Sequence, residues 1–189
     1  GSILDPSGRF RPVLLHGDRP FLRSGNHHHV FEQTHTQGSC TMPIDTVDIF
    51  GSDQVGIHLA CVGRVVFHPP EMPKPILEKI EQALELELHP ISIGGSNLIG
   101  ALICGNQRGI AVADIATESD IDQLTAFGDV VVMEGGVNTA GNLLVANENG
   151  AVASPSIPHD GLEILAEVLG VDIVSTTVAG HDVVGSLAV

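Results

Sequence analysis

The sequence contains no tryptophan and no tyrosine, and its aromatic residues are six phenylalanines. Proteins that bind single-stranded nucleic acid stack the bases on aromatic side chains, so a base-stacking surface is poorly supplied here. Basic residues are also scarce, with eight Lys and Arg against 23 Asp and Glu and a net charge of −15. Because phosphate backbones are bound by basic surfaces, we expect little direct contact with nucleic acid.

Long apolar stretches and paired cysteines are missing as well. No apolar run approaches the roughly 18 residues that a membrane-spanning helix needs. The first residues lack a basic start followed by an apolar core, so they predict no signal peptide. The cysteines Cys40, Cys61 and Cys104 are odd in number and show no paired spacing. This pattern favours a reducing, cytoplasmic location over a disulfide framework.

The acidic charge is concentrated in the larger, C-terminal part of the sequence. Residues 42–189 hold four basic residues against 20 acidic ones, a balance of −16, whereas residues 1–41 hold four Arg against three acidic residues. If the protein has a macromolecular partner, a basic protein surface is therefore the better expectation. The alternative is that the charge serves only solubility.

Residues 1–41 differ in character from the rest. They contain His27, His28 and His29 in a row, are punctuated by Pro, Gly and Ser, and sustain no helical or strand periodicity. We interpret them as an extension, natural or added, that is largely disordered, with Met42 as the candidate native start. The histidines and Cys40 suggest zinc, but their spacing matches no standard site, so we predict no metal and no other cofactor.

One short pattern occurs four times in the remaining sequence. Each copy is Gly, four residues and Gly, with Asp or Asn at the third position, and the copies read GSDQVG, GSNLIG, GVNTAG and GHDVVG from residues 51, 95, 136 and 180. The copies start 44, 41 and 44 residues apart, and a nearly fixed spacing of this size is typical of repeat architectures. Glycine permits a positive φ, and Asp or Asn can bond to its own backbone in a tight turn. Each copy therefore predicts a structured turn that leads into a strand.

The same order of elements follows each copy of the pattern, namely strand, turn, strand, helix and strand. Pairs of apolar runs predict a hairpin in each unit, at residues 57–61 and 65–68, 101–104 and 110–113, and 143–146 and 151–154. Apolar residues at helical spacing predict helices over 76–84 and 158–169, the second with Ser156 as its cap and Gly170 at its end. A capping box of Thr117 and Asp120 predicts a helix over 117–126, and strands follow from 85, 129 and 171. The fourth unit is expected to stop inside its first strand. The sequence thus predicts an α/β fold of repeats that start near residues 46, 90, 134 and 177.

Residues 46–189 resemble the translation initiation factor 6 family, the archaeal and eukaryotic ribosome anti-association factors. Three stretches carry the resemblance: IGGSNLIGALICGNQRG at 93–109, NTAGNLLVANENGAVASP at 138–155 and EILAEVLGVDIVSTTVAGHDVVGS at 163–186. The resemblance implies a pentein fold, a pseudo-symmetric β/α propeller of five blades. Five blades would need about 220 residues, so we expect about three and a half of them in residues 42–189. We therefore interpret the sequence as a piece of a longer protein, marginally stable or oligomeric because its ring is open.

The resemblance also implies a function. The family binds the joining face of the large ribosomal subunit and sterically blocks the small subunit, with no known need for catalysis or a cofactor. Because the repeats are acidic, we expect a basic ribosomal protein as the main contact, with minor contact to rRNA. Asn142 resembles a position at the ribosome-facing surface of the family, and the adjacent Gly141 would allow close approach of the backbone. The alternative for Asn142 is simple turn chemistry.

Further candidate binding residues lie in the turns. Asn106 and Arg108 fall at the predicted hairpin tip of the second unit, where the Arg would either reach an rRNA phosphate or remain solvated. The residues at the third position of the Gly pattern are interpreted as turn residues. The alternative is that they form a ring of polar groups around one mouth of the propeller; they are Asp53, Asn97, Asn138 and Asp182.

A guanidine-modifying enzyme is the rival interpretation, because some penteins use a Cys nucleophile with a His and two acids. Cys61 and Cys104 lie in apolar strand runs, where Cys behaves as a small hydrophobe, and no cationic group is placed to lower the pKa of a thiol. His58 and His68 come without an evident acid pair. We therefore predict a binding protein that is not an enzyme, with this enzyme and a structural repeat scaffold as alternatives.

Overall fold

A computed structural model describes residues 21–22, 44–134 and 139–188. Three sheets of three strands dominate it. In each sheet the first two strands pair antiparallel and the third pairs parallel to the second. This shared strand order confirms the predicted α/β repeat. The strands are β3 (Ala60–Val62), β4 (Val65–His68) and β5 (Glu87–Pro90), then β6 (Ile103–Gly105), β7 (Gly109–Ala113) and β8 (Asp129–Met133), then β9 (Leu144–Ala146), β10 (Ala151–Ala153) and β11 (Ile173–Ser175).

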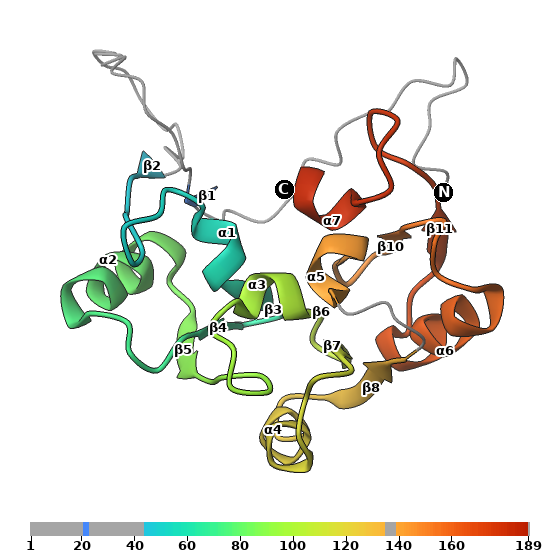
Figure 1. The fold of residues 1–189 in the computed structure, drawn as a ribbon, viewed down its shortest axis with the longest axis horizontal. Coiled ribbons are helices and arrows are strands. Elements are labelled where there is room, and N and C mark those ends of the chain that lie inside the picture. The colour runs from blue at the N-terminus through green and yellow to red at the C-terminus, as the bar shows by residue number, and fades with distance from the viewer. Residues whose placement is uncertain (1–20, 23–43, 135–138, 189) are drawn as a thin grey trace, which may run out of the picture.

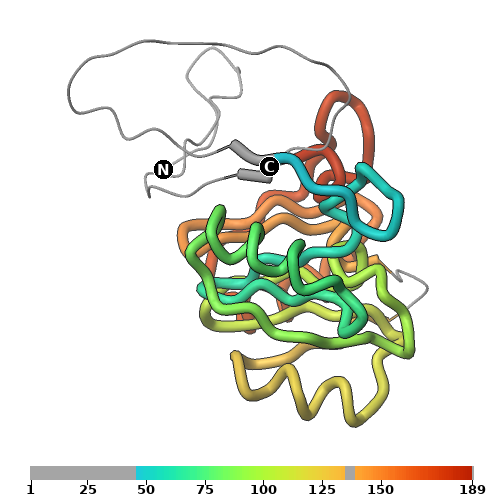
Figure 2. Tube along the Cα trace, turned by 90° about the vertical axis from the view of Figure 1, so that its left-hand side faces the viewer, coloured from blue at the N-terminus to red at the C-terminus, as the bar shows by residue number. Residues whose placement is uncertain are grey.

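Two kinds of helix accompany the sheets. A longer helix links the second and third strands of each sheet, namely α2 (Lys74–Leu84), α4 (Glu118–Leu124) and α6 (His159–Leu169). A one-turn helix precedes each hairpin and opens the fourth unit, namely α1 (Val55–His58), α3 (Ile99–Leu102), α5 (Ala140–Leu143) and α7 (Val184–Leu187). The one-turn helices lie along the inner side of an open arc and the longer helices lie outside it (Figure 1). Figure 2 turns the first unit toward the viewer, with α4 below it and α7 above.

A small parallel pair lies beside the first unit. The strand β1 (Phe21–Leu22) pairs with β2 (Ile44–Asp45), and both contact α2. The rest of residues 1–41 lies outside the described residues, so the predicted extension stays a prediction.

The predicted signals at the ends of the longer helices are confirmed at Thr117 and Gly170 but not at Ser156. Thr117 and Asp120 form a capping box, in which the Thr117 hydroxyl accepts from the Asp120 N–H at 3.2 Å and the Asp120 carboxylate accepts from the Thr117 N–H at 2.9 Å. Gly170 ends α6 in the left-handed conformation, which only glycine adopts without steric cost. Ser156 does not cap α6, because the helix begins after Pro158 without any side-chain cap.

The one-turn helices correct the predicted strands. Residues 57–61, 101–104 and 143–146 were each expected to be a single strand, but each begins within a helical turn and becomes a strand only afterwards. The fourth unit likewise reaches a helical turn, α7, instead of a strand. A run of four or five apolar residues has no period long enough to distinguish a buried helical turn from a strand.

The turn chemistry of the Gly pattern is also partly corrected. Its first glycine has a positive φ as predicted, with 80° at Gly51 and 77° at Gly95. The side chain that bonds to the backbone is that of the second residue, Ser52 or Ser96. Its hydroxyl oxygen accepts from the N–H group two residues further along the chain, at 3.1 and 3.2 Å. The Asn97 side chain at the third position donates instead to Glu71 at 3.1 Å.

The second glycine of the pattern sets the spacing between units. A Cβ atom at Gly100 would collide with the carbonyl oxygen of Gly56, one at Gly141 with that of Gly100, and one at Gly185 with that of Gly141. A larger residue at Gly100, Gly141 or Gly185 would therefore push neighbouring one-turn helices apart. We call Gly56, Gly100, Gly141 and Gly185 the glycine column.

Most of the apolar core lies between units. Phe67 of the first sheet shares a cluster with Ile99 and Ile110 of the second unit, and Ala111 of the second sheet shares one with Leu144 of the third unit. One unit cannot bury its own sheet, so neighbours complete each other's core.

Candidate functional site

Asn142 lies on α5, where its half-buried side chain meets the next unit. Its Oδ1 accepts a hydrogen bond from the Ser186 hydroxyl of α7 at 3.0 Å. Both residues directly follow a member of the glycine column, Gly141 and Gly185, and the close packing of these two glycines brings the side chains together. Asn142 was expected at the start of a strand and lies instead in a helical turn.

Gly141 and Asn97 lie near the same end of the hairpins as Asn142. The absence of a side chain at Gly141 is used inside the protein, because Gly100 packs against it. Asn97 links the first two units, since its Nδ2 donates to Glu71 and its carbonyl oxygen lies 3.1 Å from Nδ1 of His58. Asn138, another candidate binding residue, lies outside the described residues.

Asn106 and Arg108 lie at the other end of the hairpin, in the loop between β6 and β7 as predicted. Asn106 is 1% exposed, and its amide donates to the carbonyl oxygens of Leu169 at 2.8 Å and Asn147 at 3.1 Å. Its Oδ1 accepts from the backbone N–H groups of Arg108 and Gly109. Through these hydrogen bonds Asn106 holds the second unit against the third.

Arg108 is exposed, and one guanidinium nitrogen lies 3.3 Å from the carbonyl oxygen of Gly170 at the end of α6. A cation suits this position because helix C-termini carry unsatisfied carbonyl groups. The five predicted binding residues that the structure describes therefore do not form one cluster. Gly141, Asn142 and Asn97 occupy the helix end of the hairpins, whereas Asn106 and Arg108 occupy the loop end.

The helix end also carries residues that the sequence analysis missed. Besides Ser186, it exposes Ile57 on α1 and Leu98 before α3, at 39% and 46% of their surface. Phe50, 49% exposed, packs edge-on against His58 with ring centroids 5.4 Å apart. Aligning the four Gly patterns would have found the key positions, because the residue after the second glycine is in turn Ile57, Ala101, Asn142 and Ser186.

The cysteines differ in their surroundings. Burial raises the pKa of Cys104 to about 12, although backbone hydrogen bonds from Ala146 and Gly105 oppose this shift. The thiol is therefore protonated at neutral pH and poorly suited to nucleophilic attack. Cys61 lies on the exposed face of β3.

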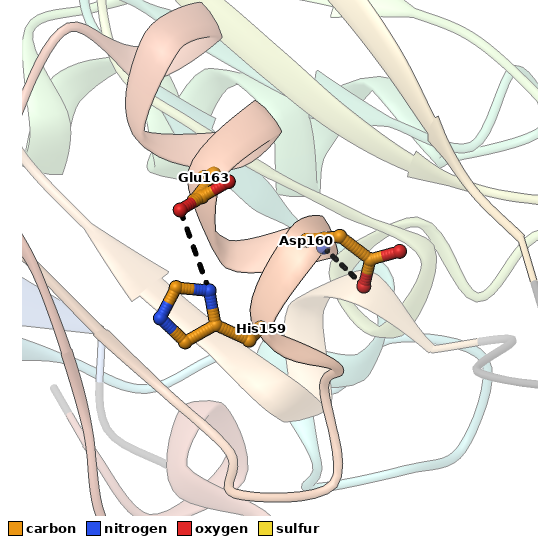
Figure 3. Close-up of polar contacts among 4 residues, drawn as sticks. His159, Asp160 and Glu163 are labelled. Atoms are coloured by element: carbon orange, nitrogen blue, oxygen red, sulfur yellow. Dashed lines mark hydrogen bonds and ion pairs between the residues drawn. The ribbon is translucent and has the colours of Figure 1, made fainter.

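One histidine–carboxylate pair lies at the start of α6. His159 Nδ1 lies 3.4 Å from Glu163 Oε1, and Asp160 accepts from the N–H of Gly161 (Figure 3). The side chains of His159 and Glu163 are 87% and 72% exposed and four residues apart, which is the arrangement of an ordinary pair on a helix surface. It provides no buried acid–base site.

Other kinds of site find little support in the described part of the chain. No group of three or more His, Cys, Asp or Glu is arranged there to hold a metal ion. Among the same residues, no helix is both long and apolar enough to span a membrane. A shallow hollow of about 420 Å³ lies beside the loop between β9 and β10, lined by acidic and small residues such as Glu148, Asp172 and Gly170.

The strand order and the packing of the units define an α/β repeat protein. Residues 44–189 match the model of the eIF-6 family. The chain belongs to this family.

Several curated relatives carry the name translation initiation factor 6. The protein of Methanothermobacter thermautotrophicus is 37% identical over 142 residues, which cover 75% of this chain and 64% of the relative. That of Methanospirillum hungatei is 30% identical, with 76% and 65% covered, and that of Pyrobaculum arsenaticum is 31% identical, with 76% and 66% covered. The chain thus spans a little less than two thirds of the length of these relatives.

Proposed function

We propose that the protein is a ribosome anti-association factor, which binds the large ribosomal subunit and sterically prevents the small subunit from joining. The observation that carries the proposal is the family match over residues 44–189, which includes the surface around Asn142. The relatives are named translation initiation factors. A steric mechanism needs a rigid surface and a long residence time on the subunit, and it needs neither turnover nor a cofactor.

We further propose that the units belong to a pentein-type propeller of five. The three sheets have one strand order, and the glycine column stacks the one-turn helices along a curved path. Further units of the same size would extend the open arc of Figure 1 toward a ring. A disc of this kind would suit a steric blocker.

The main partner in this proposal is a basic ribosomal protein, with minor contact to rRNA, and the setting is the cytoplasm, where ribosomal subunits join. The balance of −16 over residues 42–189 supports a basic protein as partner. The helix end of the hairpins is the proposed contact surface, because Asn142 and the apolar Ile57 and Leu98 lie there. Arg108 lies at the loop end, so any rRNA contact that it makes would be separate.

Sucrose-gradient sedimentation with purified large ribosomal subunits tests the proposal. The protein should co-sediment with large subunits and reduce their joining to small subunits. Asn142→Glu should weaken binding by about 1–3 kcal/mol, because it crowds the surface and leaves polar groups unpaired. Asn149→Glu at the loop end, with the same chemical change, and Cys61→Ser should bind as the unchanged protein does. If the unchanged protein stays at the top of the gradient, the proposed function is wrong.

A further inference from the structure

The bond between Ser186 and Asn142 fixes which end of the Asn142 amide faces outward. The Ser186 hydroxyl donates to Oδ1 at 3.0 Å, so the oxygen of the amide is turned toward α7. The NH2 group then points away from Ser186. An amide nitrogen offers two donors and no acceptor, and this nitrogen makes no hydrogen bond to the described residues.

This arrangement depends on the sequence at the junction of the third and fourth units. The residue after each member of the glycine column occupies the same place on its one-turn helix, and in the first two units it is Ile57 and Ala101, which have no polar side-chain atoms. Only the step from α5 to α7 places two polar side chains side by side among the described helices. Gly185, packed against Gly141 and the carbonyl of Leu144, allows the approach that the bond needs.

The negative charge of the protein limits which acceptor of a partner can approach this NH2 group. A carboxylate would accept from it, but would approach a region with a balance of −16 over residues 42–189, which costs electrostatic free energy. A backbone carbonyl oxygen is an equally suitable acceptor without a negative charge. The apolar residues Ile57 and Leu98 at the helix end of the hairpins, exposed by 39% and 46%, also favour an uncharged contact.

We propose that Ser186 is a positioning residue, which holds the Asn142 amide with its NH2 outward, and that the partner meets this NH2 with a backbone carbonyl oxygen. The second half of the inference rests on the proposed function, because the partner is the large ribosomal subunit. The first half concerns the protein alone and is tested without the ribosome.

The binding experiment compares two charge-matched variants on purified large subunits. Asn142→Asp keeps the size of the side chain and the acceptor for Ser186, but replaces the two donors with an acceptor oxygen, so binding should weaken by about tenfold or more. Asn149→Asp adds the same charge on the exposed loop end and should bind as the unchanged protein does. Equal binding by both variants would overturn the carbonyl-acceptor half while leaving the proposed function standing.

Ser186 is tested by Ser186→Ala with Ser186→Thr as the conservative variant. Loss of the hydroxyl frees the amide to flip, so Ser186→Ala should weaken binding by roughly two- to fivefold, and Ser186→Thr, which keeps the hydroxyl, should restore it. In the isolated protein, the side-chain NH2 resonances of Asn142 should report a more mobile amide in Ser186→Ala than in Ser186→Thr. Unchanged mobility in Ser186→Ala would overturn the positioning role.

If the unchanged protein does not bind large subunits at all, the partner half falls with the proposed function, and the NMR comparison still decides the role of Ser186.

Discussion

Gly100 packs directly against the carbonyl oxygen of Gly56, the glycine one unit earlier in the chain. A Cβ atom at Gly100 would also come within 2.5 Å of the carbonyl oxygen of Leu59. Both obstacles are backbone atoms, which cannot rotate away as a side chain would. The contact therefore fixes the distance between the first two units.

The first prediction follows from this contact. Gly100→Ala should lower the free energy of unfolding by about 1–3 kcal/mol, because the added methyl group overpacks a backbone contact. Gly56→Ala is the matched control, since nothing lies within 4 Å of a Cβ there, and alanine in a helical turn should leave stability unchanged or raise it by up to about 1 kcal/mol. Urea denaturation monitored by circular dichroism measures both, and equal midpoints for the two variants would contradict the prediction.

The second prediction concerns Asn106. Asn106→Ala should lower the free energy of unfolding by about 1–3 kcal/mol, because it leaves the carbonyl oxygens of Asn147 and Leu169 without their donor in a buried place. Asn149→Ala, in an exposed loop, should change it little. Thermal unfolding of the two variants provides the comparison, and an Asn106→Ala protein as stable as the control would show that the amide does not join the units.

The third prediction concerns thiol reactivity, measured in a Cys40→Ser background so that two cysteines remain. Cys61 is exposed and should react readily with a thiol reagent such as DTNB at pH 8. Cys104 should react far more slowly, because burial raises its pKa to about 12 and the thiolate is the attacking species. Single variants Cys61→Ser and Cys104→Ser assign the two rates. A fast rate that survives in Cys61→Ser would contradict the assignment.

The fourth prediction concerns pH. His68 is 4% exposed on β4; burial lowers its pKa, the hydrogen bond of Nδ1 with the Pro69 carbonyl opposes this, and nearby His89 lowers it further. The unfolded chain therefore binds a proton at this residue more readily than the folded protein does. The stabilisation is complete above the unfolded pKa of about 6.5 and is lost as the pH falls from there toward the lower folded pKa.

Unfolding at several pH values between 7.5 and 5 measures this effect. The free energy of unfolding of His68→Gln should decline less steeply over that range than that of the unchanged protein. His181→Gln, at an exposed position, should leave the slope unchanged. Parallel slopes for all three proteins would exclude His68 as the source.

Local chemistry made much of the fold predictable. The capping box of Thr117 and Asp120 and the left-handed Gly170 each act within a few residues, so the sequence displays them directly. The strand at 129–133 and the repeat of about 44 residues were also visible in the sequence. The repeat is visible because each unit must carry the same sheet if neighbouring units are to pack against one another. The one-turn helices were not, because four residues are too few to show a helical period.

The candidate site could be predicted less well, because its contacts join different units. The sequence marks Asn142 as an asparagine beside a glycine, but only the packed glycine column brings Ser186, 44 residues later, to within 3.0 Å of it. The sequence likewise marks Asn106 as a polar residue in a loop, and only the third unit, packed over that loop, buries it. The sequence by itself determined the repeat, its turns and its longer helices, since these depend on near neighbours in the chain. The tertiary structure decided which polar groups are buried and which face outward, because that depends on what the adjacent unit covers.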